Sequence, residues 1–322
     1  MTDTESAASF AEPQVGGPLP VGPEEAAIEV APLGLWADTW RRLKRNKLAL
    51  VGLAIITVFM AVGLIEIFFW VTGLHGGYLA PYNPDAVNYA IAKSPPSMQH
   101  WFGTDYIGRD VLSRTLVASR ISLLVGVIAV SISLAIGLAL GPLSGYYGGA
   151  IDAIVMRIAD VFFAFPYILF VMLLVVVLGP SFRNVFVAIG ILSWASYARI
   201  VRGTVLSVKT QEYIEAAKAA GASDLRVVFG HVLPNSMAPV YVSIAMGVGG
   251  AIVTEAALSF LGIGVQPPQA SWGNMIADYL NYLQAGQWWM ELFPCLALVI
   301  TVFGFISFGN GLRDATDPKL KE

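Results

Sequence analysis

Long apolar runs separated by shorter polar stretches dominate the sequence. The runs that suggest bilayer-spanning helices are 48–71, 121–140, 161–178, 185–198, 238–261 and 288–308. As a helix the first run would extend about 36 Å, which exceeds the ~30 Å hydrocarbon core of a bilayer. The fourth run is shorter and needs neighbouring residues to cross. The pattern predicts an all-α, polytopic membrane protein with six transmembrane helices.

The composition supports this class and excludes others. Apolar residues make up 56% of the 322 positions and charged residues 13%, whereas an average soluble domain is roughly a quarter charged. So few charges could not cover a water-soluble globule, and a disordered chain would be far less apolar. The net charge of −3 provides no basic field for nucleic acid. With one cysteine, Cys295, and three isolated histidines, we expect neither an internal disulfide nor a metal site.

Lysine and arginine are distributed unevenly between the two alternating sets of connections. One set carries 14 of them and includes the cluster at 41–47, the segment 199–239 and the C-terminal end, while the other set carries 5. Connections rich in Lys and Arg remain in the cytoplasm. We therefore predict that both termini and the segment 199–239 are cytoplasmic, and that 74–120 and 262–287 are extracytoplasmic.

These patterns divide the chain into four regions. Residues 1–38 contain seven acidic residues, no Lys or Arg, and many Pro, Gly and Ala residues, which predicts a disordered acidic cytoplasmic tail. The first transmembrane helix and an extracytoplasmic loop follow at 39–120. Within that loop, apolar residues and arginines mix over 105–120, which predicts an amphipathic helix at the outer surface. A core of five transmembrane helices (121–310) and a cytoplasmic C-terminal tail (311–322) complete the chain.

The cytoplasmic segment 199–239 contains two short predicted helices. Good helix formers occupy 211–220, and Gly221 stands where a helix end needs a left-handed residue. Ser223 or Asp224 can cap a second helix, which we expect to stop near residue 232. Leu233 precedes proline and is expected to be extended. We call this compact projection, residues 211–235, the knob.

The knob matches a known signature. The matching residues occur in the order Glu215, Ala216, Ala217, three residues, Gly221, nine residues, His231, Val232, Leu233 and Pro234. This spacing resembles the EAA loop of ATP-binding-cassette (ABC) importer permeases. The general motif has isoleucine at the position of His231, and the histidine here is similar to the peptide and nickel branch.

The resemblance extends well beyond the knob. Segments similar to dipeptide and oligopeptide permeases occur in the same order at 102–114, 145–149, 254–262, 267–274 and 311–314. The similarity covers about 36–317. It implies the fold of a type I ABC importer permease in a bacterial cytoplasmic (inner) membrane and the import of dipeptides or oligopeptides.

The resemblance also implies partners: a second homologous permease, two ABC ATPase subunits and an extracytoplasmic solute-binding protein. The sequence has no G-x-x-x-x-G-K-[ST] loop and no Gly-Lys pair, so ATP and magnesium are expected on the ATPase subunits, and this chain is expected to be a transport subunit without a cofactor. The residues implied in ATPase coupling are Glu215, Ala216, Ala217, Gly221, His231, Leu233 and Pro234. An ATP-independent secondary transporter or channel, or a membrane scaffold, remain as alternatives.

Acidic residues within the apolar runs are further candidates. Glu255 lies deep in the fifth run, where a carboxyl group must face the bundle interior, a partner or a water-filled cavity. It either lines the substrate path or makes a structural hydrogen bond between helices. Glu66 and Glu291 are expected to reach the outer interface. Asp160 is expected to pair with Arg157, three residues earlier on a helix.

Overall fold

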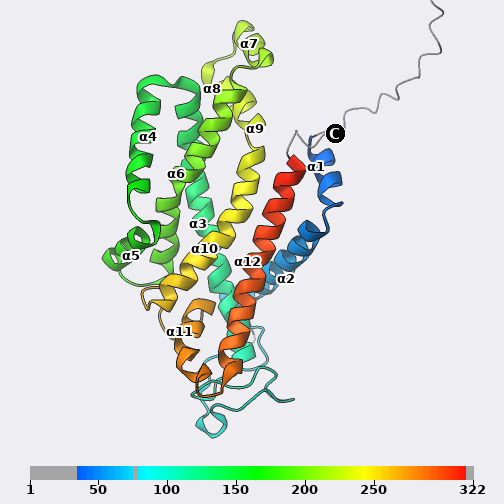
Figure 1. Ribbon diagram of the computed structural model, residues 1–322, viewed down its shortest axis with the longest axis vertical. Helices are drawn as coiled ribbons and strands as arrows, with labels where there is room; N and C mark the ends of the chain where they lie inside the picture. The colour runs from blue at the N-terminus through cyan, green and yellow to red at the C-terminus, as the bar shows by residue number, and fades with distance from the viewer. Residues whose placement is uncertain (1–34, 75–77, 317–322) are drawn as a thin grey trace, which may run out of the picture. The chain divides into compact units, whose positions relative to one another are not determined.

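The computed structural model describes residues 35–74 and 78–316. The predicted acidic tail lies outside the described residues except for its last four positions. By their internal contacts, residues 1–38 and residues 39–322 form two separate units. The helix arrangement below is that of the second unit, 39–322. The helices (Figure 1) are α1 (Leu35–Leu43), α2 (Lys47–Thr72), α3 (Val111–Tyr147), α4 (Gly149–Ala164), α5 (Tyr167–Leu178), α6 (Phe182–Val208), α7 (Glu212–Ala219), α8 (Asp224–Val227), α9 (Leu233–Asn235), α10 (Ala238–Phe260), α11 (Trp272–Leu283) and α12 (Trp288–Thr316).

Five described helices, α2, α3, α6, α10 and α12, are long and apolar enough to cross a membrane. The straight span predicted at 161–178 is wrong, because α4 and α5 meet at 91° across Phe165 and Pro166. Proline lacks an N–H and its ring disrupts the preceding helical turn. Counted as one broken span, this pair brings the total to six. α12 continues to Thr316, so 311–316 is helical and not part of a tail.

α3 begins ten residues before the predicted second span. The amphipathic surface helix expected over 105–120 is therefore wrong, because Val111 and the residues after it belong to α3. Arg114, which we expected at the surface, is buried. Its guanidinium donates to the carbonyl of Pro84 (3.2 Å) and pairs with Asp85 (3.0 Å). Loop residues distant in sequence thus make this arginine compatible with a buried position.

Glycines allow the helices to approach closely. Gly137, Gly141 and Gly145 recur every four residues on α3, and a Cβ added at these positions would lie 2.6, 2.8 and 2.8 Å from atoms of α6. A Cβ on Gly52 of α2 would likewise lie 2.7 Å from the carbonyl oxygen of Gly304 on α12. Small residues at four-residue spacing typically mediate helix contacts in membranes. α10 contacts both helices of the α3/α6 pair on one side and α12 of the α2/α12 pair on the other.

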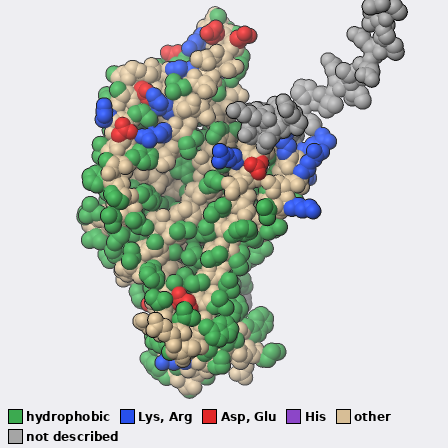
Figure 2. Space-filling model, in the orientation of Figure 1, with side chains coloured by type: hydrophobic (Ala, Val, Ile, Leu, Met, Phe, Trp, Pro, Cys, Tyr) green, Lys and Arg blue, Asp and Glu red, His purple; other side chains and the backbone are tan. Residues whose placement is uncertain are grey.

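The two ends of the bundle differ in what they carry. α7 to α9 lie at one end, and the loop 78–110 with α11 lies at the other (Figure 1). The start of α2 and the end of α12 are tied together at the first end, where the Asn46 amide donates to Asp314 (3.4 Å). Figure 2 shows hydrophobic side chains over the middle of this face and Lys and Arg mostly toward the end with α7. This separation agrees with the predicted cytoplasmic orientation of that end, which stays a prediction.

Candidate functional site: the knob and a cavity in the helix bundle

The knob folds as two short helices around a glycine turn, as the sequence predicts. α7 ends at Ala219, α8 begins at Asp224, and Gly221 between them has a φ of +84°. The N–H of Gly221 donates to the carbonyl of Lys218 (2.9 Å). A Cβ on Gly221 would meet no atom within 4 Å, so the left-handed backbone alone favours glycine there.

The extended conformation predicted for Leu233 is wrong. Its φ of −61° and ψ of −47° are helical, and a π-helical turn at Val228–Val232 leads directly into α9. A π-helical turn is wider than an α-helical one. In a regular α-helix the ring of Pro234 would meet the carbonyl of Gly230 four residues earlier, so a wider turn before the proline suits its ring.

A small apolar cluster attaches the knob to the bundle. Its fully buried members from the knob are Ile214, Val227, Val228 and Val232. They pack against Tyr146 of α3, Val201 and Val205 of α6, and Val240 of α10.

Polar contacts reinforce this attachment. The hydroxyl of Tyr146 donates to Asp224 (2.8 Å). The ammonium group of Lys209 donates to the carbonyls of Gly145 (2.7 Å) and Tyr146 (3.2 Å) at the end of α3. The sequence analysis missed Tyr146 and Lys209, because their partners are distant along the chain. The knob is thus held by the ends of α3, α6 and α10.

Most of the signature residues lie on the outer surface of the knob. The exposed ones are Glu215, Ala216, Gly221, His231 and Pro234. Ala217 and Leu233 are half-buried. Three large apolar side chains nearby, Tyr213, Leu225 and Phe229, are 46%, 58% and 48% exposed. Large apolar side chains exposed on one projection are candidates for a contact with another protein. The coupling role of the signature residues stays a prediction.

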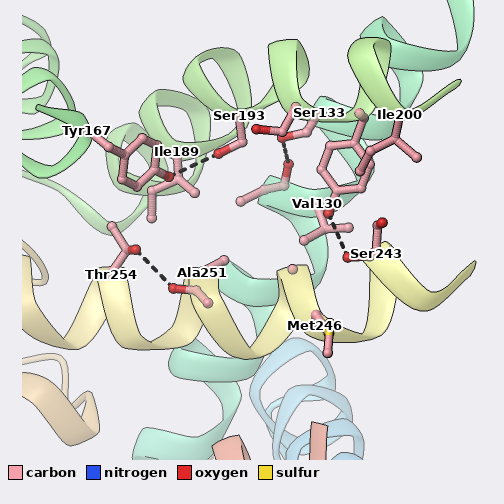
Figure 3. A pocket seen from close by; sticks show the side chains of 15 residues that line it. Val130, Ser133, Tyr167, Ile189, Ser193, Ile200, Ser243, Met246, Ala251 and Thr254 are labelled. Carbon is pink, nitrogen blue, oxygen red and sulfur yellow. Dashed lines mark hydrogen bonds between the residues drawn. The ribbon is translucent and has the colours of Figure 1, made fainter. Parts of the chain in front are cut away.

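A cavity of about 340 Å³ lies between α3, α6 and α10 (Figure 3). Hydroxyl groups reach it from Tyr167 of α5, from α6 and from α10. Tyr167 and Ser193 share a hydrogen bond (3.0 Å), and Tyr197 donates to the carbonyl of Ser243 (3.3 Å). Gly247 makes room for Tyr197, because a Cβ there would lie 2.1 Å from its hydroxyl oxygen.

The sequence analysis did not identify this cavity, because it weighed only ionisable residues within the apolar runs. The available signal was the repetition of serine and threonine within apolar runs whose other side chains face lipid or the protein core. Ser193, Ser196, Ser243 and Thr254 are such residues, and all of them line the cavity. Polar side chains inside membrane spans typically face the bundle interior.

Glu255 follows Thr254 on α10 but does not line the cavity. Its side chain is fully buried, and its two carboxyl oxygens accept hydrogen bonds from Ser122 (3.2 Å) and Ser259 (2.7 Å). Ser122 also accepts from the backbone N–H of Trp272 (3.3 Å), so this network joins α10, α3 and α11. The geometry supports the structural alternative for Glu255, and a role on the substrate path stays a prediction.

Other acidic residues lie elsewhere than predicted. Glu66 and Glu291, expected at the outer interface, are buried within the protein at 0% and 8% exposed, and the N–H of Leu79 in the outer loop donates to Glu66 (3.3 Å). Asp160 pairs with Arg199 of the adjacent α6 (2.7 Å) and not with Arg157, as far as the described residues show. Within 35–74 and 78–316, no three His, Cys, Asp or Glu side chains are grouped to hold a metal ion.

Buried polar side chains order the outer loop, 78–110. Asp105 is fully buried, pairs with the guanidinium of Arg109 (2.6 Å) and accepts a hydrogen bond from Tyr279 of α11 (3.2 Å). Burial raises the pKa of Asp278, on the same helix, and the charges of Arg109 and Arg114 oppose that rise. Polar contacts therefore link the outer loop to α11, and together they cover one end of the bundle.

Comparisons with known proteins agree with one another. A family model described as "Binding-protein-dependent transport system inner membrane component" matches residues 133–322, and one described as "N-terminal TM domain of oligopeptide transport permease C" matches 34–96. The dipeptide transport system permease protein DppC of Bacillus subtilis is 42% identical, covering 92% of this chain and 90% of that protein. The oligopeptide transport system permease protein OppC of the same organism is 44% identical, covering 90% and 92%.

A third relative is named for a different substrate. The glutathione transport system permease protein GsiD of Pectobacterium atrosepticum is 42% identical, covering 89% of this chain and 92% of that protein. Among solved structures, a chain of the MetNI methionine ABC transporter in inward-facing conformations matches with 19% identity and a TM-score of 0.47. That match covers 61% of this chain and 94% of the other.

Proposed function

The chain belongs to the family of binding-protein-dependent transport system inner membrane components, and we propose that it is the permease subunit of an ATP-driven importer of dipeptides or oligopeptides. The names of relatives at 42–44% identity support the peptide cargo. ATP would be hydrolysed by separate subunits that dock on the knob. A second permease and an extracytoplasmic binding protein would complete the importer.

One observation carries the coupling part of this proposal. α3, α6 and α10 line the cavity, and the same three helices hold the knob through Tyr146, Val201, Val205 and Val240. The hydroxyl of Thr204 on α6 also donates to the carbonyl of Ser236 (3.3 Å), just before α10. A force applied to the knob therefore acts directly on the walls of the cavity. Packed helices transmit such displacements because their interfaces deform little.

The exposed apolar side chains of the knob are the proposed contact with the ATPase. A short helix that inserts apolar side chains into a groove is a common mode of protein recognition. Tyr213, Leu225 and Phe229 supply those side chains, and Ala216 leaves room for close approach of α7.

Substitution of Leu225 tests this contact. Leu225→Asp places a charge on the proposed docking surface without changing the buried cluster, since the side chain is 58% exposed. We expect the amount of co-purifying ATPase to fall by about tenfold, which is typical for an interface anchor. ATP-dependent uptake of alanylalanine by reconstituted vesicles should fall with it. Met98→Asp at the outer end, where the side chain is 92% exposed, is the matched control and should leave the amount of co-purifying ATPase unchanged.

Two outcomes would contradict the proposal. Normal ATPase association in Leu225→Asp would show that the ATPase does not dock on this face of the knob. Uptake by the wild-type chain without ATP and without any ATPase subunit would favour the alternative of a secondary transporter or channel.

A further inference from the structure

We propose that the α3/α6/α10 cavity is a binding site for the neutral amide groups of a peptide backbone. This inference rests on the proposed peptide import and adds a site and its chemistry within this chain. It follows from the size of the cavity, from the charge of its lining and from the hydrogen-bonding capacity that its hydroxyl groups retain.

The cavity is large and long enough for a short stretch of peptide. Its volume of about 340 Å³ lies within the range of ligand pockets, roughly 300–1,000 Å³. Its lining runs from Ile189 to Ile200 on α6 and from Ser243 to Thr254 on α10. Each stretch covers about 16 Å of helix, roughly half of the hydrocarbon thickness.

The lining carries no formal charge. None of the described residues around the cavity is Asp, Glu, Lys, Arg or His. A charged group that enters a site within the membrane and finds no oppositely charged partner there loses its hydration energy without compensation. A free ammonium or carboxylate terminus is therefore disfavoured in this cavity, whereas an uncharged amide is not.

The hydroxyl groups offer mostly acceptors. Four hydroxyls already donate to backbone carbonyls: Ser133 to Gly190 (2.8 Å), Ser243 to Pro239 (2.9 Å), Thr254 to Gly250 (2.9 Å) and Tyr197 to Ser243 (3.3 Å). Their remaining lone pairs can accept hydrogen bonds from a ligand. Figure 3 shows the contacts of Thr254 and Tyr197 as dashed lines beside the open space.

Ser196 supplies the complementary donor. Ser196 is exposed, lines the cavity from α6 and makes no hydrogen bond to another described residue. Several acceptors with a free donor match a peptide group, which has one N–H and one carbonyl. Ile189, Ile200 and Met246 form apolar walls that suit aliphatic side chains, and methionine adapts readily to different shapes.

Protection of a cysteine tests binding directly. The assembled complex with Ile200→Cys, which leaves every hydroxyl of the cavity in place, in a Cys295→Ala background is alkylated with a small thiol reagent in detergent. N-acetylalanine methylamide, a neutral compound with two amide N–H groups, should slow alkylation roughly threefold at about twice its dissociation constant. The analogue methylated on both amide nitrogens and free alanine, a zwitterion, should not. Gly203→Cys, at an exposed position of α6 outside the cavity, should be unaffected by all three.

Absence of protection by the neutral amide would overturn the proposal. Equal protection by the methylated analogue would do so as well, because the hydroxyl acceptors would then contribute nothing. Both outcomes are independent of transport.

A steric variant tests whether the site lies on the transport route. A Cβ at Gly250 meets nothing within 4 Å, so Gly250→Leu places its side chain in the open space of the cavity. Uptake of pentaalanine, whose inner amides lie away from its charged termini, should fall about tenfold or more while the ATPase still co-purifies. Gly203→Leu, where a Cβ also meets nothing within 4 Å, is the matched control and should transport normally.

The outcomes separate this inference from the proposed function. If the wild-type complex imports no peptide, the proposed function is wrong and the inference falls with it. If the wild type imports pentaalanine and Gly250→Leu does so equally well, the inference alone is wrong. If Gly250→Leu does not assemble, the protection experiment decides.

Discussion

The two ends of the helix bundle are held together by different kinds of contact. At the outer end, Asp105 is fully buried, accepts hydrogen bonds from two backbone N–H groups and Tyr279, and pairs with Arg109. Trp289 of α12 also donates to the carbonyl of Thr104 there (3.2 Å). At the knob end, a small cluster around Ile214 provides the apolar contact, and the acid that accepts from Tyr146 is exposed.

This difference has a mechanical consequence. The buried hydrogen bonds and ion pair of Asp105 permit few alternative geometries, because a shift leaves a desolvated carboxylate without its partners. A small apolar cluster with only partly buried polar contacts can rearrange at lower cost. We infer that the outer end keeps its shape while the knob end is the part able to shift. The predictions below test this contrast, beginning with the largest expected effect.

Removal of the central outer acid should destabilise the protein most. Asp105→Ala leaves the guanidinium of Arg109, 12% exposed, without its ion partner and the hydroxyl of Tyr279 without its acceptor. Removing one member of a buried pair costs about 3–5 kcal/mol of unfolding free energy. Unfolding in mixed micelles measures this loss. Asp105→Asn, which retains an acceptor oxygen, should lose less, and a loss below about 1 kcal/mol in Asp105→Ala would contradict a rigid outer end.

Substitution of the knob glycine should affect coupling more than folding. Gly221→Val forces a β-branched residue to a φ of +84°, a strain of about 1–2 kcal/mol or more. The transmembrane helices should form normally, while peptide uptake per ATP hydrolysed falls. Gly230→Val in the same knob is the matched control, since its φ is not in the left-handed region and a Cβ there meets nothing within 4 Å. ATP hydrolysis and uptake measured in the same vesicles give the ratio, and wild-type coupling in Gly221→Val would rule out this turn as a transmission element.

Glu255 provides a test in the middle of the bundle. Glu255→Gln replaces one accepting oxygen by a donor, so either Ser122 or Ser259 loses its acceptor, at a cost of about 1–2 kcal/mol. Because the residue is outside the cavity lining, we expect uptake per assembled complex to stay near wild type. Ser122→Ala removes a contact of the same network from α3 and should behave alike. Uptake that falls further than the amount of complex would support the substrate-path role instead.

Apolar periodicity and local helix signals were sufficient to predict most of the helices. Five of the six apolar runs correspond to long helices, because a bilayer requires uninterrupted apolar length whatever the tertiary contacts. The two helices of the knob and its turn at Gly221 also follow from nearby residues alone. α11 was missed although it carried a readable signal. Ser271 and Asn274 form a reciprocal capping box at its start.

The remaining features depend on contacts between residues far apart in sequence. Arg114 indicated a surface helix, but in the fold its guanidinium is buried and contacts Pro84 and Asp85. The burial of Glu66 depends in the same way on the fold of the outer loop. The cavity arises from the relative placement of three helices, which no local pattern specifies. The same dependence explains why the substrate-path role of Glu255 could not be decided from its depth in the membrane.

We expect the smallest effect from removing an acid at the knob end, the substitution that corresponds to Asp105→Ala at the outer end. Asp224→Ala removes an acid that is exposed and accepts from the hydroxyl of Tyr146 (2.8 Å), so water can replace the lost contact. We expect a loss of about 0.5–1 kcal/mol in the same unfolding measurement. Tyr146→Phe removes this hydrogen bond from the other side and should cost a similar amount. If Asp224→Ala were as destabilising as Asp105→Ala, the knob would be fixed as firmly as the outer end, and the proposed contrast between them would be wrong.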